Sequence, residues 1–179
     1  MNELKVTQIL KNDLGFSNSS IEKIRKFNNY LLKYNKSYNL ISKSTESKIW
    51  YRHILDSAQI IKFIDFSKIK NLADFGSGAG FPGLIIALYN ENSAFHVKLY
   101  EKSQVKRDFL RDVKNNLNIK NITIENNVYD EEVLADVIVC RAFKKLDEIL
   151  GISREIVKKP HKLIILKGKN AQSEINNVS

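Results

Sequence analysis

The chain has 179 residues and a formal net charge of +9, from 29 lysines and arginines against 20 aspartates and glutamates. Its 43% hydrophobic residues suffice for an ordinary core, so the length predicts one domain with at most a small appendage. The single cysteine excludes an internal disulfide and a cysteine-rich metal centre. With no long apolar run and no secretory signal, we expect a protein of the reducing cytoplasm that makes no membrane contact.

Residues 1–62 are expected to form a helical extension. Ser19 with Glu22 three residues later has the pattern of a capping box. Apolar residues then recur at helical spacing, namely Ile21, Ile24, Phe27, Leu31 and Tyr34. After a turn or loop at residues 38–42, a second amphipathic helix is predicted from about Thr45 to Ile61, with Trp50, Ile54, Ser57 and Ile61 on one side.

From about residue 69, short apolar runs alternate with helical segments, which is the pattern of a parallel sheet with crossover helices. Five strands are predicted, at Asn71–Phe75, His96–Tyr100, Ile122–Glu125, Ala135–Cys140 and Lys162–Leu166. Ser103 is expected to cap a helix that carries Val105, Phe109, Val113 and Leu117. Residues 63–179 are therefore expected to form an open, doubly wound α/β domain.

Four of the seven glycines follow the first strand closely, at Gly76, Gly78, Gly80 and Gly83. A strand-to-helix turn of this composition offers free backbone N–H groups, which predicts a nucleotide-type cofactor loop. The register Gly76-x-Gly78-x-Gly80 matches S-adenosylmethionine-dependent methyltransferases, and Gly78-x-Gly80-x-x-Gly83 matches the dinucleotide fingerprint. The first register is favoured because it begins at the end of the strand and leaves Pro82 outside the pattern.

Two acidic residues accompany this loop. Asp74 precedes it, near the place expected for the amino end of an aminoacyl ligand. Glu101 ends the second predicted strand, about 20 residues beyond the loop, where a carboxylate accepts hydrogen bonds from both ribose hydroxyls. The loop and Glu101 together favour a bound cofactor over a purely structural turn.

Five sequence blocks in order then resemble one family, the bacterial small-subunit ribosomal RNA methyltransferase G, also called glucose-inhibited division protein B. The blocks are Tyr38-Asn39-Leu40, His53-Ile54-Leu55-Asp56-Ser57, the segment from Asp74 to Gly83, Arg141-Ala142-Phe143 and Leu166-Lys167-Gly168. The resemblance implies a Rossmann-like class I S-adenosylmethionine-dependent methyltransferase, with an open, mostly parallel sheet and helices on both faces. The implied reaction methylates the seven-position nitrogen of one guanine in small-subunit (16S) rRNA or in the ribosomal subunit.

The resemblance also implies site residues. Gly76 and Phe81 fall in the cofactor loop, Val128 and Tyr129 fall on the adenine side, and Arg141 falls beside the cofactor and the target. The expected cofactor-binding set is Gly76, Gly78, Gly80, Phe81, Glu101, Val128, Tyr129 and Arg141.

The chain departs from the family in two places. Tyr129 stands where an acid is usual, so a backbone contact or stacking must replace any side-chain hydrogen bond there. The sequence stops at Ser179, ahead of the family's final antiparallel strand pair, which predicts an exposed sheet edge.

Methylation of this nitrogen is an in-line displacement by a lone pair that carries no proton, so alignment replaces a general base. Arg141 is the expected catalytic residue, positioning the guanine or a flanking phosphate through its fixed fork of donors. Its structural alternative is a strand-end arginine paired with a surface acid.

Cys140 ends an apolar strand and is expected to be an inert thiol. His53, His96 and His161 have no metal-ligand spacing.

The positive charge favours RNA, although a solvated lysine-rich surface explains the charge alone equally well. The side chains expected to contact RNA are Lys33, Lys36, Arg52, His53, Lys106 and Arg107. A brace on the sheet is the structural alternative for His53. Three other functions stay open, namely an NAD-dependent oxidoreductase, a small-molecule methyltransferase and a non-catalytic or truncated RNA-binding relic. A monomer is expected.

Overall fold

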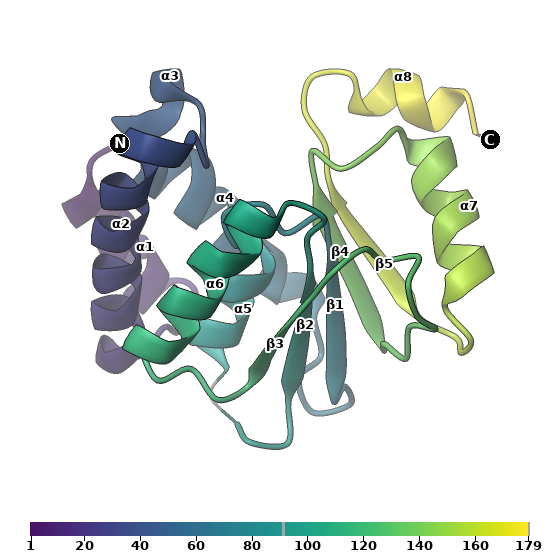
Figure 1. Ribbon diagram of the computed structural model, residues 1–179, viewed down its shortest axis with the longest axis horizontal. Helices are drawn as coiled ribbons and strands as arrows, with labels where there is room; N and C mark the ends of the chain where they lie inside the picture. Colours follow the sequence, from purple (N-terminus) through teal and green to yellow (C-terminus); the bar gives the residue numbers. More distant parts are fainter. Residues whose placement is uncertain (91, 179) are drawn as a thin grey trace.

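The structure is a computed structural model, and it describes residues 1–90 and 92–178. Five parallel strands form one sheet in the order β3-β2-β1-β4-β5 (Figure 1). The strands are β1 (Asn71–Phe75), β2 (His96–Tyr100), β3 (Ile122–Glu125), β4 (Val137–Arg141) and β5 (Lys162–Leu166). The predicted strands are confirmed, with one shift in the bounds. β4 begins two residues later than predicted and includes Arg141, because Arg141 still pairs with Leu166.

The N-cap of the long N-terminal helix lies two residues before the predicted cap. α1 (Glu3–Asn12) is followed by α2 (Asn18–Tyr38), whose N-cap is Ser17, with its Oγ accepting a hydrogen bond from the Ser20 N–H at 3.0 Å. The predicted capping box of Ser19 and Glu22 is therefore wrong, because the chain enters the helix before Ser19. The apolar stripe of α2 is buried as predicted, except that Tyr34 is only partly buried.

The predicted helix from Thr45 to Ile61 is broken into four short pieces. These are α3 (Lys43–Glu46), the π-helix η1 (Trp50–Leu55), α4 (Asp56–Ala58) and the 3-10 helix η2 (Gln59–Phe63). The expected buried side is nevertheless correct, since Trp50, Ile54, Ser57 and Ile61 are all buried. A π-turn carries one more residue than an α-turn and is frequent at functional sites. Arg52, His53 and Asp56 lie on this irregular segment.

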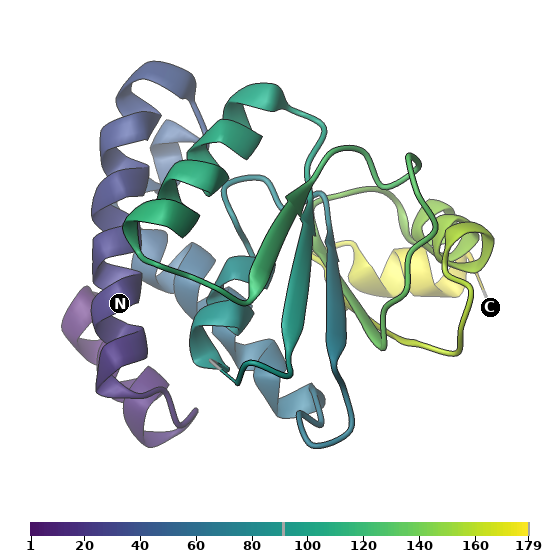
Figure 2. The same cartoon turned by 60° about the horizontal axis from the view of Figure 1, so that its bottom comes forward.

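Helices cover both faces of the sheet, which confirms the predicted α/β class. α5 (Gly83–Tyr89) and α6 (Gln104–Asn116) lie with α1 and α2 on one face, and α7 (Leu146–Ile156) lies on the other (Figure 1). α8 (Ala171–Asn176) lies at the N-terminal end of α7. Figure 2 also shows the sheet between these two groups of helices. Two hydrophobic clusters fill the two interfaces.

β1 shows how the two clusters share one strand. Its Leu72 belongs to the cluster under α2, α5 and α6, whereas Ala73 and Phe75 belong to the cluster under α7. Successive side chains of a strand point to opposite faces, so Asp74 shares the face of Leu72. This alternation decides where Asp74 lies, as described below.

The N-terminal helices share the first cluster with the sheet. Phe27 of α2 packs against Phe81, with ring centroids 5.4 Å apart, and against Phe109 of α6 at 6.2 Å. Ser103 occupies the N-cap of α6 as predicted but makes no side-chain capping bond, and Val105 is exposed whereas Phe109 is buried. The division into residues 1–62 and 63–179 stays a prediction. In the described part of the chain, no helix is both long and apolar enough to cross a membrane.

Candidate functional site

A cavity of about 550 Å³ lies at the carboxyl ends of β1 to β4. In a parallel sheet this edge is where ligands bind, because the connecting loops diverge there. The cavity gathers most of the predicted cofactor residues, namely Gly76, Gly78, Phe81, Glu101, Val128, Tyr129 and Arg141. Gly80 does not line it. Residues 40–42 and Thr45 from the N-terminal part close the cavity on the side of α3.

The glycines after β1 serve different purposes. Gly76, Gly78 and Gly80 all have positive φ, at +74°, +58° and +100°. A Cβ on Gly80 would lie 3.0 Å from the Leu84 side chain, so this glycine allows α5 to pack closely. A Cβ on Gly78 would meet nothing nearer than the Gly76 carbonyl oxygen at 3.9 Å. Gly78 therefore leaves open space inside the cavity, where a ligand fits against the backbone.

Glu101 joins this loop to the end of β2. Its carboxylate is 7% exposed and accepts hydrogen bonds from the Gly78 N–H and the Ser103 N–H, each at 2.8 Å. The backbone N–H groups of Gly76 and Ser77 both donate to the Tyr100 carbonyl at 2.9 Å. These bonds fix the loop and the carboxylate in one frame, so the spare lone pairs of Glu101 are held at the cavity wall.

The position predicted for Asp74 is wrong. Asp74 is fully buried under α5, does not line the cavity, and accepts a hydrogen bond through Oδ2 from the Gly83 N–H at 2.8 Å. Its Oδ1 has no partner among the described residues. Burial raises the pKa of Asp74 to about 7, and the Gly83 N–H opposes that shift. Asp74 therefore fastens α5 to β1, and it is not placed to meet a ligand.

The raised pKa of Asp74 gives the fold a specific pH dependence. A carboxyl whose native pKa is about 7, against an ordinary value of 3.8, keeps its proton to a higher pH in the folded chain than in the unfolded chain. Its stabilising contribution is therefore complete below about pH 4 and falls as the pH rises towards 7, by up to about 1.4 kcal/mol per pH unit. We expect Asp74→Asn to remove this slope, measured as the free energy of unfolding in urea between pH 4 and 7. Equal slopes in both proteins would contradict the assignment.

Arg141 forms the wall of the cavity together with His53. Its guanidinium donates to the Arg52 carbonyl at 2.9 Å and to the His53 Nδ1 at 2.7 Å, and it lies 5.1 Å from the centroid of the Phe81 ring. His53 stacks on the same ring, with centroids 5.1 Å apart. The partners of Arg141 are thus a carbonyl, an imidazole and an aromatic face, and no surface acid forms an ion pair with it among the described residues.

The protonation state of His53 follows from these contacts. Burial, together with the positive charges of Arg141 and Arg52, lowers the pKa of His53 to about 4. The imidazole is neutral near pH 7, with Nδ1 accepting from Arg141 and Nε2 donating to the Thr45 Oγ at 3.0 Å. His53 therefore holds Arg141 in place without adding a charge of its own.

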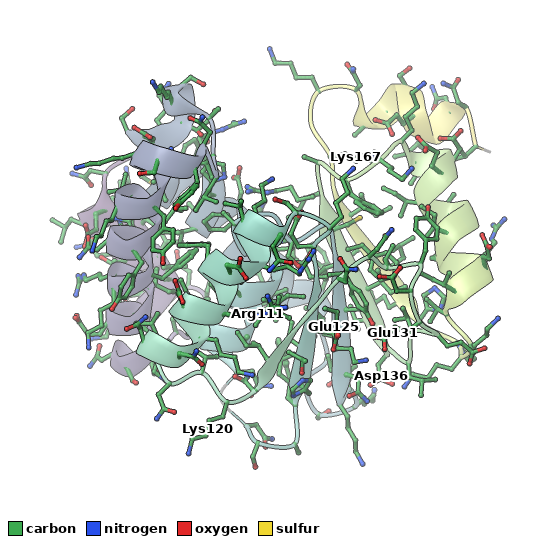
Figure 3. The ribbon with its side chains drawn as sticks, viewed as in Figure 1. Arg111, Lys120, Glu125, Glu131, Asp136 and Lys167 are labelled. Carbon is green, nitrogen blue, oxygen red and sulfur yellow. The ribbon has the colours of Figure 1, made fainter. Side chains whose placement is uncertain are left out.

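A second cavity of about 870 Å³ adjoins the first and is also lined by basic side chains. The two cavities share Thr45, His53, Arg141, Ala142 and Lys144 in their walls. The second continues to the loop between β5 and α8, where Lys167 lies at the end of β5 under α8 (Figure 3). Ala142 has a φ of +50°, a left-handed conformation that is rare for alanine and is found repeatedly at functional sites.

On the proposed adenine side, Val128 is buried, whereas Tyr129 is half exposed at the rim of the first cavity. The Tyr129 N–H is held by the Asn127 side chain at 3.5 Å. A ring in this position offers a flat face to a base, in place of the hydrogen bond that an acid would make.

The predicted RNA contacts separate into three groups. Lys106 and His53 line the first cavity, Arg52 lines the second with His53, and Lys33 and Lys36 are exposed on α2 outside both.

Arg107 does not fit the prediction. It is 9% exposed, and its guanidinium donates to the carbonyls of Glu101 and Lys102 at 2.8 and 2.7 Å. Arg107 thus shapes the turn after β2, and we leave it out of the RNA-binding set.

Two residues in the wall of the first cavity, Thr45 and Lys144, were not foreseen from the sequence. Phe143, whose ring the sequence offers as a stacking surface for adenine or an extruded base, also lines this cavity. Phe143 covers Gly76, where a Cβ would lie 2.5 Å from its ring. Cys140 is buried, and burial raises its pKa to about 12, as expected for an inert thiol.

The chain matches one family of known proteins over most of its length. The family model GidB, described as rRNA small subunit methyltransferase G, matches residues 20–179. A relative of that name from Rickettsia akari (strain Hartford) is 39% identical over 163 residues, which is 89% of this chain and 81% of the relative. Another from Magnetococcus marinus is 35% identical over 161 residues, or 87% and 72% of the two chains. The chain belongs to this family.

Solved structures of other methyltransferases share the fold of this family member. The O-MT unit of StiE, residues 961–1257, has a TM-score of 0.55 at 16% identity and covers 84% of this chain and 51% of that chain. Precorrin-6y C5,15-methyltransferase from Geobacter metallireducens also has a TM-score of 0.55, at 13% identity, covering 79% and 72%. Both confirm the Rossmann-like class I architecture predicted from the sequence.

Proposed function

We propose that this member of the methyltransferase G family transfers a methyl group from S-adenosylmethionine to the seven-position nitrogen of a guanine in 16S rRNA of the small subunit. The observation that carries the proposal is the pair of adjoining cavities with Arg141 in their common wall. One cavity has the features of a cofactor site and the other is basic, so two ligands would meet at Arg141. An oxidoreductase, a small-molecule methyltransferase or a relic would not account for this pairing together with the family match.

The residues of the first cavity fit S-adenosylmethionine. The open space beside Gly78 accommodates a ligand against the backbone, and Glu101 supplies a fixed carboxylate for ribose hydroxyls. Val128 and Tyr129 would border the adenine. When bound, the cofactor supplies an activated methyl group on a sulfonium.

The chain's own contribution is alignment. The seven-position nitrogen attacks through a lone pair, so no side chain has to remove a proton. Neutral His53 agrees with this requirement, because it is engaged at both ring nitrogens with Thr45 and Arg141. Arg141 is the proposed catalytic residue, with donors that orient guanine through its six-position oxygen or hold a flanking phosphate.

RNA would contact basic side chains that surround both cavities. The proposed contacts with the RNA backbone are Arg52 and Lys106 at the cavities and, farther out on α2, Lys33 and Lys36. Both cavities are built from one chain, so we propose a monomer as the working form. The rRNA substrate makes the cytoplasm its proposed place of action.

The test is methyl transfer to ribosomal subunits that lack this modification. Purified chain is incubated with methyl-labelled S-adenosylmethionine and small subunits, with large subunits as the control. The expected product is labelled 7-methylguanosine in 16S rRNA, identified after digestion to nucleosides. Label in another nucleoside would overturn the assigned atom, and no label from folded protein would overturn the proposed function.

A further inference from the structure

Asp56 is a carboxylate at the start of α4 that the proposed chemistry has not used. It is half-buried and lines the second cavity but not the first. Among the described residues, no hydrogen bond or ion pair reaches its side chain. Burial raises the pKa of Asp56, while the charges of Arg52 and Arg141 oppose that shift. Its two oxygens are therefore acceptors without donors at the wall of a cavity.

Asp56 is a carboxylate in a cavity that is otherwise mostly basic. Positive side chains dominate the second cavity, namely Arg52, Arg141, Lys144, Lys167 and Lys169. The other acid there, Glu174, is engaged by the Lys167 ammonium at 2.7 Å and the Leu146 N–H at 2.8 Å. A cavity that only gripped phosphates would gain nothing from a free carboxylate, because the two negative groups repel. Asp56 fits a ligand that carries N–H donors as well as phosphates.

Guanine is the nucleobase that matches a carboxylate best. Its Watson–Crick edge presents two adjacent donors, the N1–H and the exocyclic amino group, whereas adenine, cytosine and uracil place an acceptor beside each donor there. Single-stranded bases in RNA are read on this edge by hydrogen bonds. A carboxylate with two free oxygens accepts both guanine donors at once, and it repels the acceptor of any other base.

The position of Asp56 also agrees with the atom to be methylated. The seven-position nitrogen lies on the Hoogsteen edge of guanine, apart from the N1–H and the amino group. Asp56 borders only the second cavity, whereas Arg141 borders both. A guanine whose N1–H and amino group faced Asp56 would therefore keep its seven-position nitrogen free for the methyl group of the cofactor.

We propose that Asp56 is the specificity-determining residue that binds the N1–H and amino group of the target guanine. This inference rests on the proposed function and adds the means by which guanine is chosen. Asp56 selects the base, Arg141 lies between the base and the cofactor, and the lysines of the second cavity hold the flanking phosphates.

The test combines one change in the protein with one change in the base. Asp56→Asn replaces one acceptor by a donor, and inosine in place of the target guanosine removes the amino group while keeping the seven-position nitrogen. The position of the target is taken from the methylation assay, and the RNA is assembled by ligation. With guanosine, we expect Asp56→Asn to lower kcat/KM by about 10- to 100-fold, the range for one bidentate contact to a base.

The pattern across the four combinations decides the matter. The wild type is expected to lose about tenfold in kcat/KM on inosine, whereas Asp56→Asn should not distinguish inosine from guanosine. The same loss of kcat/KM on inosine in both proteins would overturn the role of Asp56. Equal kcat/KM on inosine and guanosine in the wild type would overturn it as well, and this outcome can be measured without any variant. Absence of label from the wild type on guanosine would instead overturn the proposed function, and this inference with it.

Two controls separate recognition from folding. Asp65→Asn makes the same change at an exposed carboxylate outside both cavities and should leave kcat/KM unchanged. Calorimetric titration with S-adenosylhomocysteine should give equal affinities for the wild type and Asp56→Asn, because Asp56 does not line the cofactor cavity. A loss of that affinity would assign Asp56 a structural role and overturn the proposal.

Discussion

Replacing Gly78 by arginine is expected to abolish binding of S-adenosylhomocysteine in a chain that remains folded. A side chain at this position starts in open space, with the nearest atom 3.9 Å from its Cβ, and extends into the cavity of about 550 Å³. The left-handed φ of +58° adds a strain of about 1–2 kcal/mol for a non-glycine residue, which a stable domain tolerates. Calorimetric titration measures the loss, with NAD as the comparison ligand.

The matched control is Gly151→Arg. Gly151 lies in α7 with nothing within 4 Å of its ideal Cβ and with no positive φ. The same side chain there should leave the affinity unchanged. If Gly78→Arg bound S-adenosylhomocysteine as tightly as the wild type, the loop after β1 would not hold the cofactor, and the first cavity would need another ligand.

Replacing Arg141 by lysine is expected to lower the rate of methyl transfer by about 100-fold, with a smaller effect on the affinity for S-adenosylhomocysteine. Lysine keeps the charge but loses the planar fork that reaches the Arg52 carbonyl and His53 Nδ1 together. The target base would then be held less well, so the loss should appear mainly in kcat. Single-turnover assays on unmodified small subunits measure it.

Arg111→Lys serves as the control for this exchange. Arg111 lies exposed on α6 and pairs with Asp108 at 2.9 Å (Figure 3). Thermal unfolding of both variants checks that each chain remains folded. A lysine at position 141 that supported the full rate would show that charge alone is sufficient and that the fork of donors does not position the target.

The strands could be predicted because each is a short apolar run bounded by turn residues, and such a run fits a buried parallel strand. The segment after Thr45 could not, because the apolar period of a helix does not reveal whether a π-turn or a 3-10 turn interrupts it. The buried side of that segment was correct all the same. Burial is set by spacing, whereas the exact hydrogen-bond pattern depends on packing against the sheet.

The candidate site divides in the same way. The cofactor loop and Glu101 were recognisable because backbone geometry restricts which residues occupy those positions. Asp74 was misplaced because its nearness to the loop in sequence outweighed the alternation along β1, which puts it on the face of Leu72 under α5. Arg107 was misplaced because charge alone does not show whether a guanidinium turns outward to solvent or inward to carbonyls.

Arg141, His53 and Thr45 stand in the walls of both cavities, so a displacement of any one of them alters both cavities at once. A ligand that draws the guanidinium into one cavity changes the shape and charge of the other, since the same hydrogen bonds border both. By linkage, whatever factor the cofactor contributes to RNA affinity, RNA must return to cofactor affinity. Any such factor would act through the residues that the two cavities share, with Arg141 hydrogen-bonded to His53 and His53 to Thr45.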